Sequence, residues 1–159
     1  YAARADVQSV FHLHSVAGVV VASQPEGLLP LSQNAMLLRD RIRHYPYTGA
    51  RIDRDESARM ATALGDGTVL LLRNHGTLVV GRSIGEAFAF VVRAEKAFAI
   101  QLAAQAAQVP LLPASAADED EAAALGLGLY RQGGASPAAS VEWAALLRKA
   151  VRDSPGFDR

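Results

Sequence analysis

Thr68-Val69-Leu70-Leu71-Leu72-Arg73-Asn74-His75-Gly76-Thr77-Leu78-Val79-Val80-Gly81 is the stretch that decides the fold. Residues 68–73 form a continuous apolar run, which is typical of a strand covered on both faces. Asn and Gly tolerate left-handed backbone conformations, so residues 74–76 indicate a tight turn. Residues 77–81 are again rich in β-branched and apolar side chains and predict a returning strand. The stretch therefore predicts a hairpin with His75 at its tip.

The elements around this hairpin are predicted from periodicity and capping residues. Residues 7–14 alternate as a strand, with Val7, Ser9, Phe11 and Leu13 on one face and Gln8, Val10, His12 and His14 on the other. Predicted helices are 15–22 capped by Ser15, one from Ser32 or Asn34 to about His44, one from Asp53 or Asp55 to Leu64, and 84–108 with the capping box Ser83 to Glu86. Strands separated by helices give an α/β fold, expected to be a three-layer α/β/α sandwich around a mostly antiparallel sheet.

The composition changes along the second half of the chain. Residues 1–112 are expected to form the core unit. Residues 113–140 are Ala-rich, then acidic, then Gly-rich, and predict a flexible or partly helical linker. Residues 141–159 are expected to form a helical tail, with a helix over 141–151 anchored by Trp143, Leu146 and Leu147.

The bulk composition excludes several classes of function. The 159 residues include 16 basic and 16 acidic side chains, so no net field favours nucleic acid. Cysteine is absent, which excludes disulfides and thiolate metal sites and is compatible with a cytoplasmic location. The longest apolar run, 16–22, is too short to span a bilayer, and no signal peptide opens the chain.

Three of the four histidines lie in two short motifs, His12-Leu13-His14 and Asn74-His75-Gly76. Residues i and i+2 of a strand face the same way, so His12 and His14 are able to bind one ion together. His75 would complete a set of three nitrogen ligands with an open fourth position, as in catalytic metal sites. Each motif taken alone has a simpler interpretation: polar residues on a strand face for the first, and turn chemistry with an incidental histidine for the second.

Several segments together resemble the class II aldolase/adducin family. They are Phe11-His12-Leu13-His14-Ser15, Gly27-Leu28-Leu29-Pro30, residues 71–82 around Asn74-His75-Gly76, and Glu86-Ala87-Phe88. The resemblance runs from Tyr1 to about Gln108, and residues 142–148 resemble a branch of bacterial members. It implies that His12, His14 and His75 bind a divalent ion, usually zinc, with manganese, cobalt or iron as alternatives. The chain looks like the C-terminal two-thirds of such a protein, so we expect a further segment before Tyr1.

The family's mechanism gives expectations for the rest of the site. The ion binds the carbonyl and hydroxyl oxygens of a sugar-like substrate and stabilises the enediolate formed as a carbon–carbon bond breaks. A carboxylate moves the proton. In the family's aldolases this Glu and the phosphate-holding segments precede the first histidine motif, so the acid–base residue is expected upstream of Tyr1.

Other side chains are weaker candidates for the site. Glu95 lies near the apolar side of the long helix, where it could accept the second ring N–H of a ligand histidine or pair with Arg or Lys. Glu26 and Glu56 are expected to be surface or capping groups, and Asn74 is a candidate for a contact with the ligands or the substrate. Family enzymes form rings of four in which a neighbouring subunit supplies a tyrosine. Packing is the alternative role for the three candidates here, Tyr45, Tyr47 and Tyr130.

The resemblance therefore implies a divalent-metal-dependent lyase that cleaves a sugar-like hydroxy-carbonyl compound. The expected partners are a small carbohydrate-like substrate and identical subunits in a homotetramer, with no nucleic acid and no membrane. Three alternatives stay open: a sugar-phosphate epimerase, an adducin-like scaffold that binds actin or the cytoskeleton, and a site that binds metal without turnover.

Overall fold

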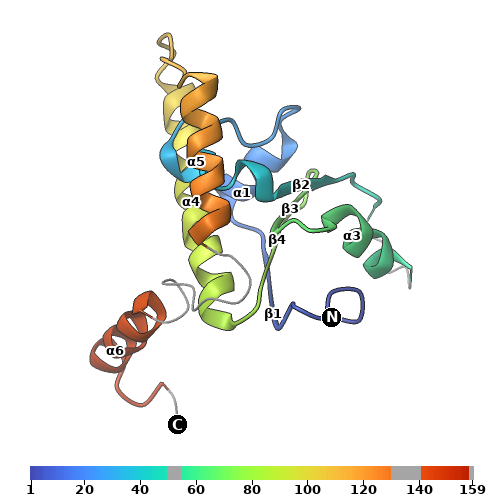
Figure 1. Cartoon of the computed structure of the whole chain (residues 1–159), viewed down its shortest axis with the longest axis vertical. Helices are drawn as coiled ribbons and strands as arrows, with labels where there is room; N and C mark the ends of the chain where they lie inside the picture. Colours follow the sequence, from blue (N-terminus) through green and yellow to red (C-terminus); the bar gives the residue numbers. More distant parts are fainter. Residues whose placement is uncertain (50–54, 130–140, 158–159) are drawn as a thin grey trace.

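A mixed four-stranded sheet forms the centre of the computed structural model, which describes residues 1–49, 55–129 and 141–157 (Figure 1). The strands are β1 (Ser9–Leu13), β2 (Ile42–Tyr45), β3 (Val69–Leu72) and β4 (Gly76–Gly81), in the spatial order β1-β4-β3-β2. β4 pairs antiparallel with both β1 and β3, whereas β2 pairs parallel with β3. The sheet is therefore mostly antiparallel, as expected, with one parallel edge.

The predicted hairpin is confirmed as β3 and β4. Every residue of β3 is buried, as expected for a strand covered on both faces. The backbone N–H of His75 donates to the carbonyl of Leu72 over 3.0 Å, and Asn74 has a left-handed φ of 57°. These two features close the turn and leave the His75 side chain at the tip.

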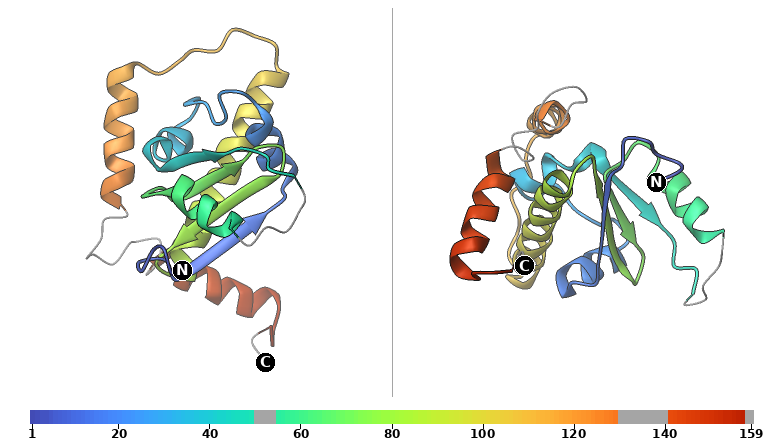
Figure 2. Two further views of the ribbon diagram at one scale, coloured as in Figure 1. Left: turned by 90° about the vertical axis from the view of Figure 1, so that its right-hand side faces the viewer. Right: turned by 90° about the horizontal axis from the view of Figure 1, so that it is seen from below.

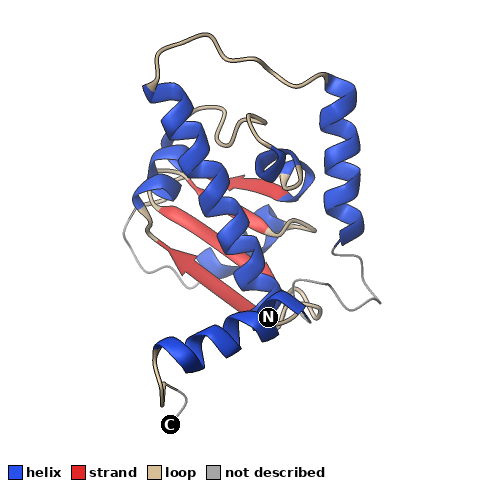
Figure 3. Cartoon of the chain, turned by 90° about the vertical axis from the view of Figure 1, so that its left-hand side faces the viewer, coloured by secondary structure: helices blue, strands red, loops and turns tan. Residues whose placement is uncertain are grey.

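Helices cover both faces of the sheet (Figures 2 and 3). One face packs against α1 (Val16–Ser23) and α4 (Ile84–Ala106), and the other packs against α3 (Glu56–Leu64). The first core contains Val21, Ala22, Leu38, Val69, Leu71, Val79, Ala89, Phe90, Ala94 and Phe98. The second contains Val7, Tyr45, Leu64, Leu70, Leu72 and Val80. The three-layer arrangement predicted from the sequence is thus confirmed.

The prediction of a helix that runs to about His44 is wrong. Ser32 does cap α2 (Gln33–Met36) by accepting the N–H of Ala35, but the helix ends after one turn. A 3-10 helix follows at Arg39–Arg41, and residues 42–45 become β2. Pairing with the buried strand β3 overrides the weak local helix preference, and it places Tyr45 in the second core.

Most other predicted boundaries agree with the structure to within two residues. Ser15 and Ser83 accept N–H groups at the starts of α1 and α4, as predicted. Asp55 stands at the N-cap position of α3 but makes no capping hydrogen bond through its side chain, and Asp53 lies outside the described residues. Val7 precedes β1 and packs in the second core, whereas Phe11 packs against the first. The prediction that these two residues share a face is therefore wrong.

The predicted linker contains a further helix, α5 (Ala116–Leu129). It packs against α2 and the 3-10 helix, where Arg39 pairs with Asp120 at 2.8 Å. This helix fits the partly helical alternative for the linker, because alanine favours helix and Ser115 caps it by accepting the N–H of Asp118. Residues 130–140 lie outside the described residues, and the division into domains stays a prediction.

The tail forms α6 (Trp143–Asp153), as expected, but only one of its three predicted anchors is well packed. The Trp143 ring lies 5.7 Å from that of Phe88, centroid to centroid, whereas Leu146 and Leu147 are each 39% exposed. None of the helices in the described ranges is both long enough and apolar enough to cross a membrane.

Candidate metal centre

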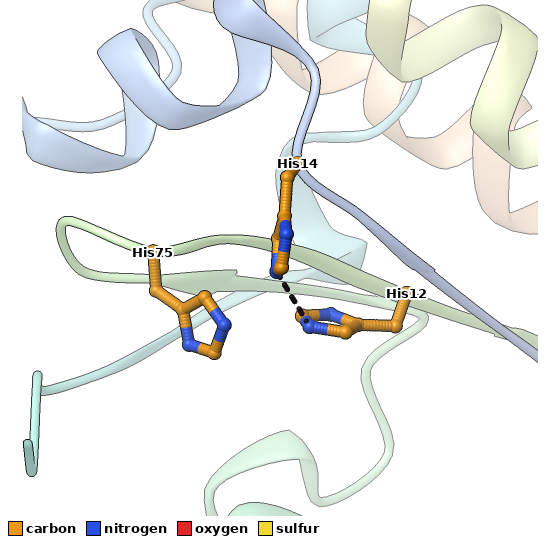
Figure 4. A group of neighbouring side chains, drawn as sticks. All are labelled: His12, His14 and His75. Atoms are coloured by element: carbon orange, nitrogen blue, oxygen red, sulfur yellow. Dashed lines mark hydrogen bonds between the residues drawn. The ribbon is translucent and has the colours of Figure 1, made fainter. Parts of the chain in front are cut away.

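The three histidines of the two motifs meet at one end of the sheet (Figure 4). His12 lies in β1, His14 follows it, and His75 projects from the β3–β4 turn. Their ring centroids are 4.6 to 5.0 Å apart, and one nitrogen from each ring lies within 4.8 Å of the other two. All three side chains are exposed. The simpler interpretations of the separate motifs do not account for this convergence.

Strand pairing explains why residues more than sixty positions apart lie together. β1 runs antiparallel to β4, with Leu13 opposite Thr77, so the end of β1 reaches the hairpin tip. Gly76 makes the close approach possible. A Cβ at this position would collide with the carbonyl oxygen of Leu13 and would stand 3.0 Å from Cδ2 of His14.

The backbone also fixes the tautomer of His12. Its Nδ1 lies 3.1 Å from the carbonyl oxygen of Thr77, which only accepts hydrogen bonds, so Nδ1 carries the proton. The Nε2 lone pair of His12 therefore faces the other rings, and His14 Nε2 lies 2.9 Å away. A backbone carbonyl that holds the second ring nitrogen is the usual support for a metal-binding histidine.

The surroundings of His75 disfavour its charged form. The pKa of His75 is lowered, first because surrounding protein atoms remove water from part of the ring and then because His12 and His14 repel a positive charge. The carboxylate of Glu56, at the start of α3, opposes this by raising the same pKa. A lowered pKa keeps the imidazole in the neutral form that binds metal.

The donor set fits a divalent transition metal. Tetrahedral zinc with nitrogen ligands at about 2.0–2.1 Å holds those nitrogens roughly 3.3 Å apart. The nitrogens here span 2.9 to 4.8 Å, so small rotations of exposed rings would bring them into that geometry. Three imidazoles on an exposed edge leave the fourth position open to solvent or substrate.

Glu95 does not take the position expected for it. Its Oε1 accepts the hydroxyl of Ser15 over 2.8 Å, and the acceptor for the His12 ring N–H is the Thr77 carbonyl. Within residues 1–49, 55–129 and 141–157, this carboxylate therefore makes neither the histidine contact nor an ion pair with Arg or Lys. Glu95 reaches the site through Ser15, the residue after His14.

The remaining candidates are placed as follows. Asn74 is exposed in the left-handed turn position, which agrees with its interpretation as a turn residue. Tyr45 is 5% exposed in the second core, where its hydroxyl accepts from Nε of Arg59 at 3.4 Å. Tyr47 is 55% exposed beyond β2. Tyr130 lies outside the described residues.

Sequence reasoning missed two contacts made by residues that neighbour the histidine motifs. The Thr77 carbonyl is a backbone group whose alignment depends on the β1–β4 register, and no sequence signal gives that register. Arg73 donates to backbone carbonyls at the end of α1. A charged residue at the end of an apolar strand, directly before Asn74-His75, was the available signal for it.

Comparison with known proteins identifies the family of this chain. Residues 1–102 match the family described as Class II Aldolase and Adducin N-terminal domain. A Caulobacter vibrioides protein that carries the name of the class 2 aldolases is 37% identical over 160 residues, covering 99% of this chain and 60% of that protein. Human gamma-adducin is 37% identical over 107 residues, covering 67% of this chain and 15% of that protein.

Solved structures show the same fold. An aldolase II superfamily protein from Pseudomonas syringae has a TM-score of 0.84 at 35% identity, covering 96% of this chain and 59% of that one. L-fuculose 1-phosphate aldolase from Glaciozyma antarctica has a TM-score of 0.74 at 25% identity, covering 95% of this chain and 54% of that one. The chain thus spans about 60% of the first curated relative it matches. By its sequence and its fold, the chain belongs to the class II aldolase and adducin family.

Proposed function

We propose that this chain carries the metal centre of a lyase that cleaves a carbon–carbon bond in a sugar-like hydroxy-carbonyl compound. The observation that carries the proposal is the convergence of three imidazole nitrogens within 4.8 Å on an exposed edge of the sheet. Similarity to the aldolase from Glaciozyma antarctica supports the reaction class.

The three histidines, His12, His14 and His75, form the triad of this proposal, and each has a defined part in it. His12, His14 and His75 would hold the ion, and the Thr77 carbonyl orients His12 so that Nε2 faces it. Zinc is the ion we propose first, because an all-imidazole donor set suits it. When bound, the ion would supply Lewis-acid polarisation of the substrate carbonyl. The exposed side of the triad leaves room for neighbouring carbonyl and hydroxyl oxygens.

The assembly and location of the protein are also proposals. We propose a homotetramer and a cytoplasmic location, on the resemblance to the family's enzymes. Size-exclusion chromatography with light scattering tests the tetramer, because a monomeric mass would contradict it.

The activity is tested on the zinc-loaded full-length protein, including the segment expected before Tyr1, by incubating it with a panel of ketose and aldose 1-phosphates and following products by NMR. We expect zinc-dependent cleavage that is lost in His75→Ala and kept in His44→Ala, which removes the histidine outside the triad. Interconversion of stereoisomers without cleavage would instead indicate an epimerase.

A binding protein without turnover is the second candidate, and similarity to gamma-adducin favours it. The two candidates differ in a measurable way. Zinc binding through His12, His14 and His75 with no conversion of any compound in the panel by the full-length protein would contradict the lyase and support the binding protein.

A further inference from the structure

Helix α1 links the two segments that carry the histidines. Its N-cap, Ser15, directly follows His14, and its last residue is Ser23. The helix packs against α4 and lies over β3, which leads into the His75 turn, and over β4, which leads out of it. The position of α1 therefore affects where His14 stands relative to His75.

Arg73 fastens the C-terminal end of α1 to the hairpin tip. Its guanidinium donates to the carbonyl of Ala22 at 3.2 Å, to that of Pro25 at 2.9 Å, and to that of Gln24. These oxygens lie where a helix leaves carbonyls without partners and where its dipole is negative, so a cation binds well there. Arg73 stands two residues before His75, and this contact therefore connects the third ligand to α1.

Glu95 fastens the other end of α1. The Ser15 hydroxyl accepts the N–H of Gly18 at 3.0 Å and donates to Glu95 Oε1 at 2.8 Å. The first bond caps the helix, and the second attaches the cap to α4. A hydrogen bond to a carboxylate is stronger than one between neutral groups. His14 thus precedes a residue that is held from two sides.

We infer that Arg73 and Glu95 are positioning residues of the metal centre, which hold α1 as a brace between His14 and His75. The inference rests on the proposed metal site and assigns these side chains no contact with the ion or with substrate. Groups that orient metal ligands typically account for 10–100-fold in affinity. A merely stabilising role would lower the free energy of unfolding without changing the zinc affinity of the folded protein.

The test compares zinc affinity, measured by competition with a chromophoric chelator, with the stability of the metal-free protein, measured in urea. Arg73→Gln and Glu95→Ala are expected to weaken zinc binding about 10–100-fold. Glu95→Gln keeps an oxygen for the Ser15 hydroxyl and is expected to retain most of the affinity. If Arg73→Gln does not fold, Arg73→Lys replaces it, and its single ammonium is expected to give an intermediate loss.

Arg43 provides a matched control. It also donates to backbone carbonyls, those of Asp40 and Ile42, and pairs with Asp66, but it joins neither histidine segment. Arg43→Gln is expected to lower stability while leaving zinc affinity within about threefold, less than one tenfold step of 1.4 kcal/mol. The inference would be overturned if Arg73→Gln bound zinc as tightly as wild type. It would also be overturned if Arg73→Gln and Arg43→Gln lost zinc affinity to the same extent.

A double variant gives an independent check. Because both side chains act through α1, Arg73→Gln combined with Glu95→Ala should lose less affinity than the product of the two single losses. If the two losses of zinc affinity simply multiplied, the two side chains would not act through the same helix, and the inference would be contradicted. Failure of the proposed function looks different, because then wild type and His75→Ala would bind zinc equally and all positioning variants would match them.

Discussion

Gly76→Ala tests whether the close approach of β1 to the hairpin tip builds the metal centre. The new methyl group would collide with the carbonyl oxygen of Leu13, a backbone atom that cannot rotate away, and would press on His14 at 3.0 Å. Normal carbon contacts begin near 3.5 Å, so the end of β1 must move by roughly 1 Å. Metal–ligand distances tolerate only about 0.2 Å.

Two quantities are expected to change in this variant. Overpacking costs about 1–3 kcal/mol, which for a chain of this length lowers the unfolding temperature by roughly 2–12 °C. Displacement of His14 from His75 is expected to weaken zinc binding at least about tenfold, as loss of ligand orientation does. Calorimetry and chelator competition measure the two effects.

Gly128→Ala is the matched control for this substitution. It lies in α5, and a methyl group there would meet nothing within 4 Å. Alanine in a helix is more favourable than glycine by about 1 kcal/mol, so this variant is expected to be slightly more stable with unchanged zinc affinity. Wild-type zinc affinity and stability in Gly76→Ala would refute the reasoning.

Three further predictions concern the scaffold and are each checked by urea unfolding. Ser83→Ala removes the cap of α4 and is expected to cost about 1 kcal/mol, whereas Ser83→Gly should cost only a few tenths; equal losses would contradict a capping role. Gln101→Leu leaves the partly buried N–H of Leu29 and the buried carbonyl of Gly27 without the partner they have now, so a loss of about 1–3 kcal/mol for each is expected, and wild-type stability would contradict this. Desolvation, and then Arg73, lower the pKa of His44 below 6.5, so unfolded chains bind more protons there; its contribution to stability is complete above pH 6.5 and is lost as the pH falls. His44→Gln should therefore show a weaker fall in stability between pH 7.5 and 5.5 than wild type, and parallel pH profiles would contradict the assignment.

Local patterns predicted those parts of the fold that depend on local chemistry. The apolar run before Asn74-His75-Gly76 gave the hairpin, and Ser83 gave the start of α4, because turn conformation and helix capping are set by a few neighbouring residues. β2 was missed because its four residues are strand only by pairing with β3, a contact made across 27 positions of sequence. Tertiary pairing of this kind overrides local preference.

The candidate site likewise has a part that local sequence predicted and a part that it did not. Strand periodicity put His12 and His14 on one face, and His75 was a candidate third ligand whose role the family resemblance then implied. The supporting contacts were not predictable, because each joins distant segments: the Thr77 carbonyl to His12, Glu95 to Ser15, and Arg73 to the end of α1. Such contacts depend on register and helix packing, which one sequence does not specify.

Equilibrium dialysis against zinc tests the central claim most directly, using wild type, the single alanine variants of His12, His14 and His75, and His44→Ala. Wild type and His44→Ala are expected to bind one zinc ion per chain. Each single alanine variant of His12, His14 and His75 is expected to bind at least roughly 100-fold more weakly, since a zinc site that gains about 10–16 kcal/mol from all its ligands loses about 3–5 kcal/mol with one of three. Equal zinc content in wild type and His75→Ala would contradict the assignment of the three histidines as one metal centre.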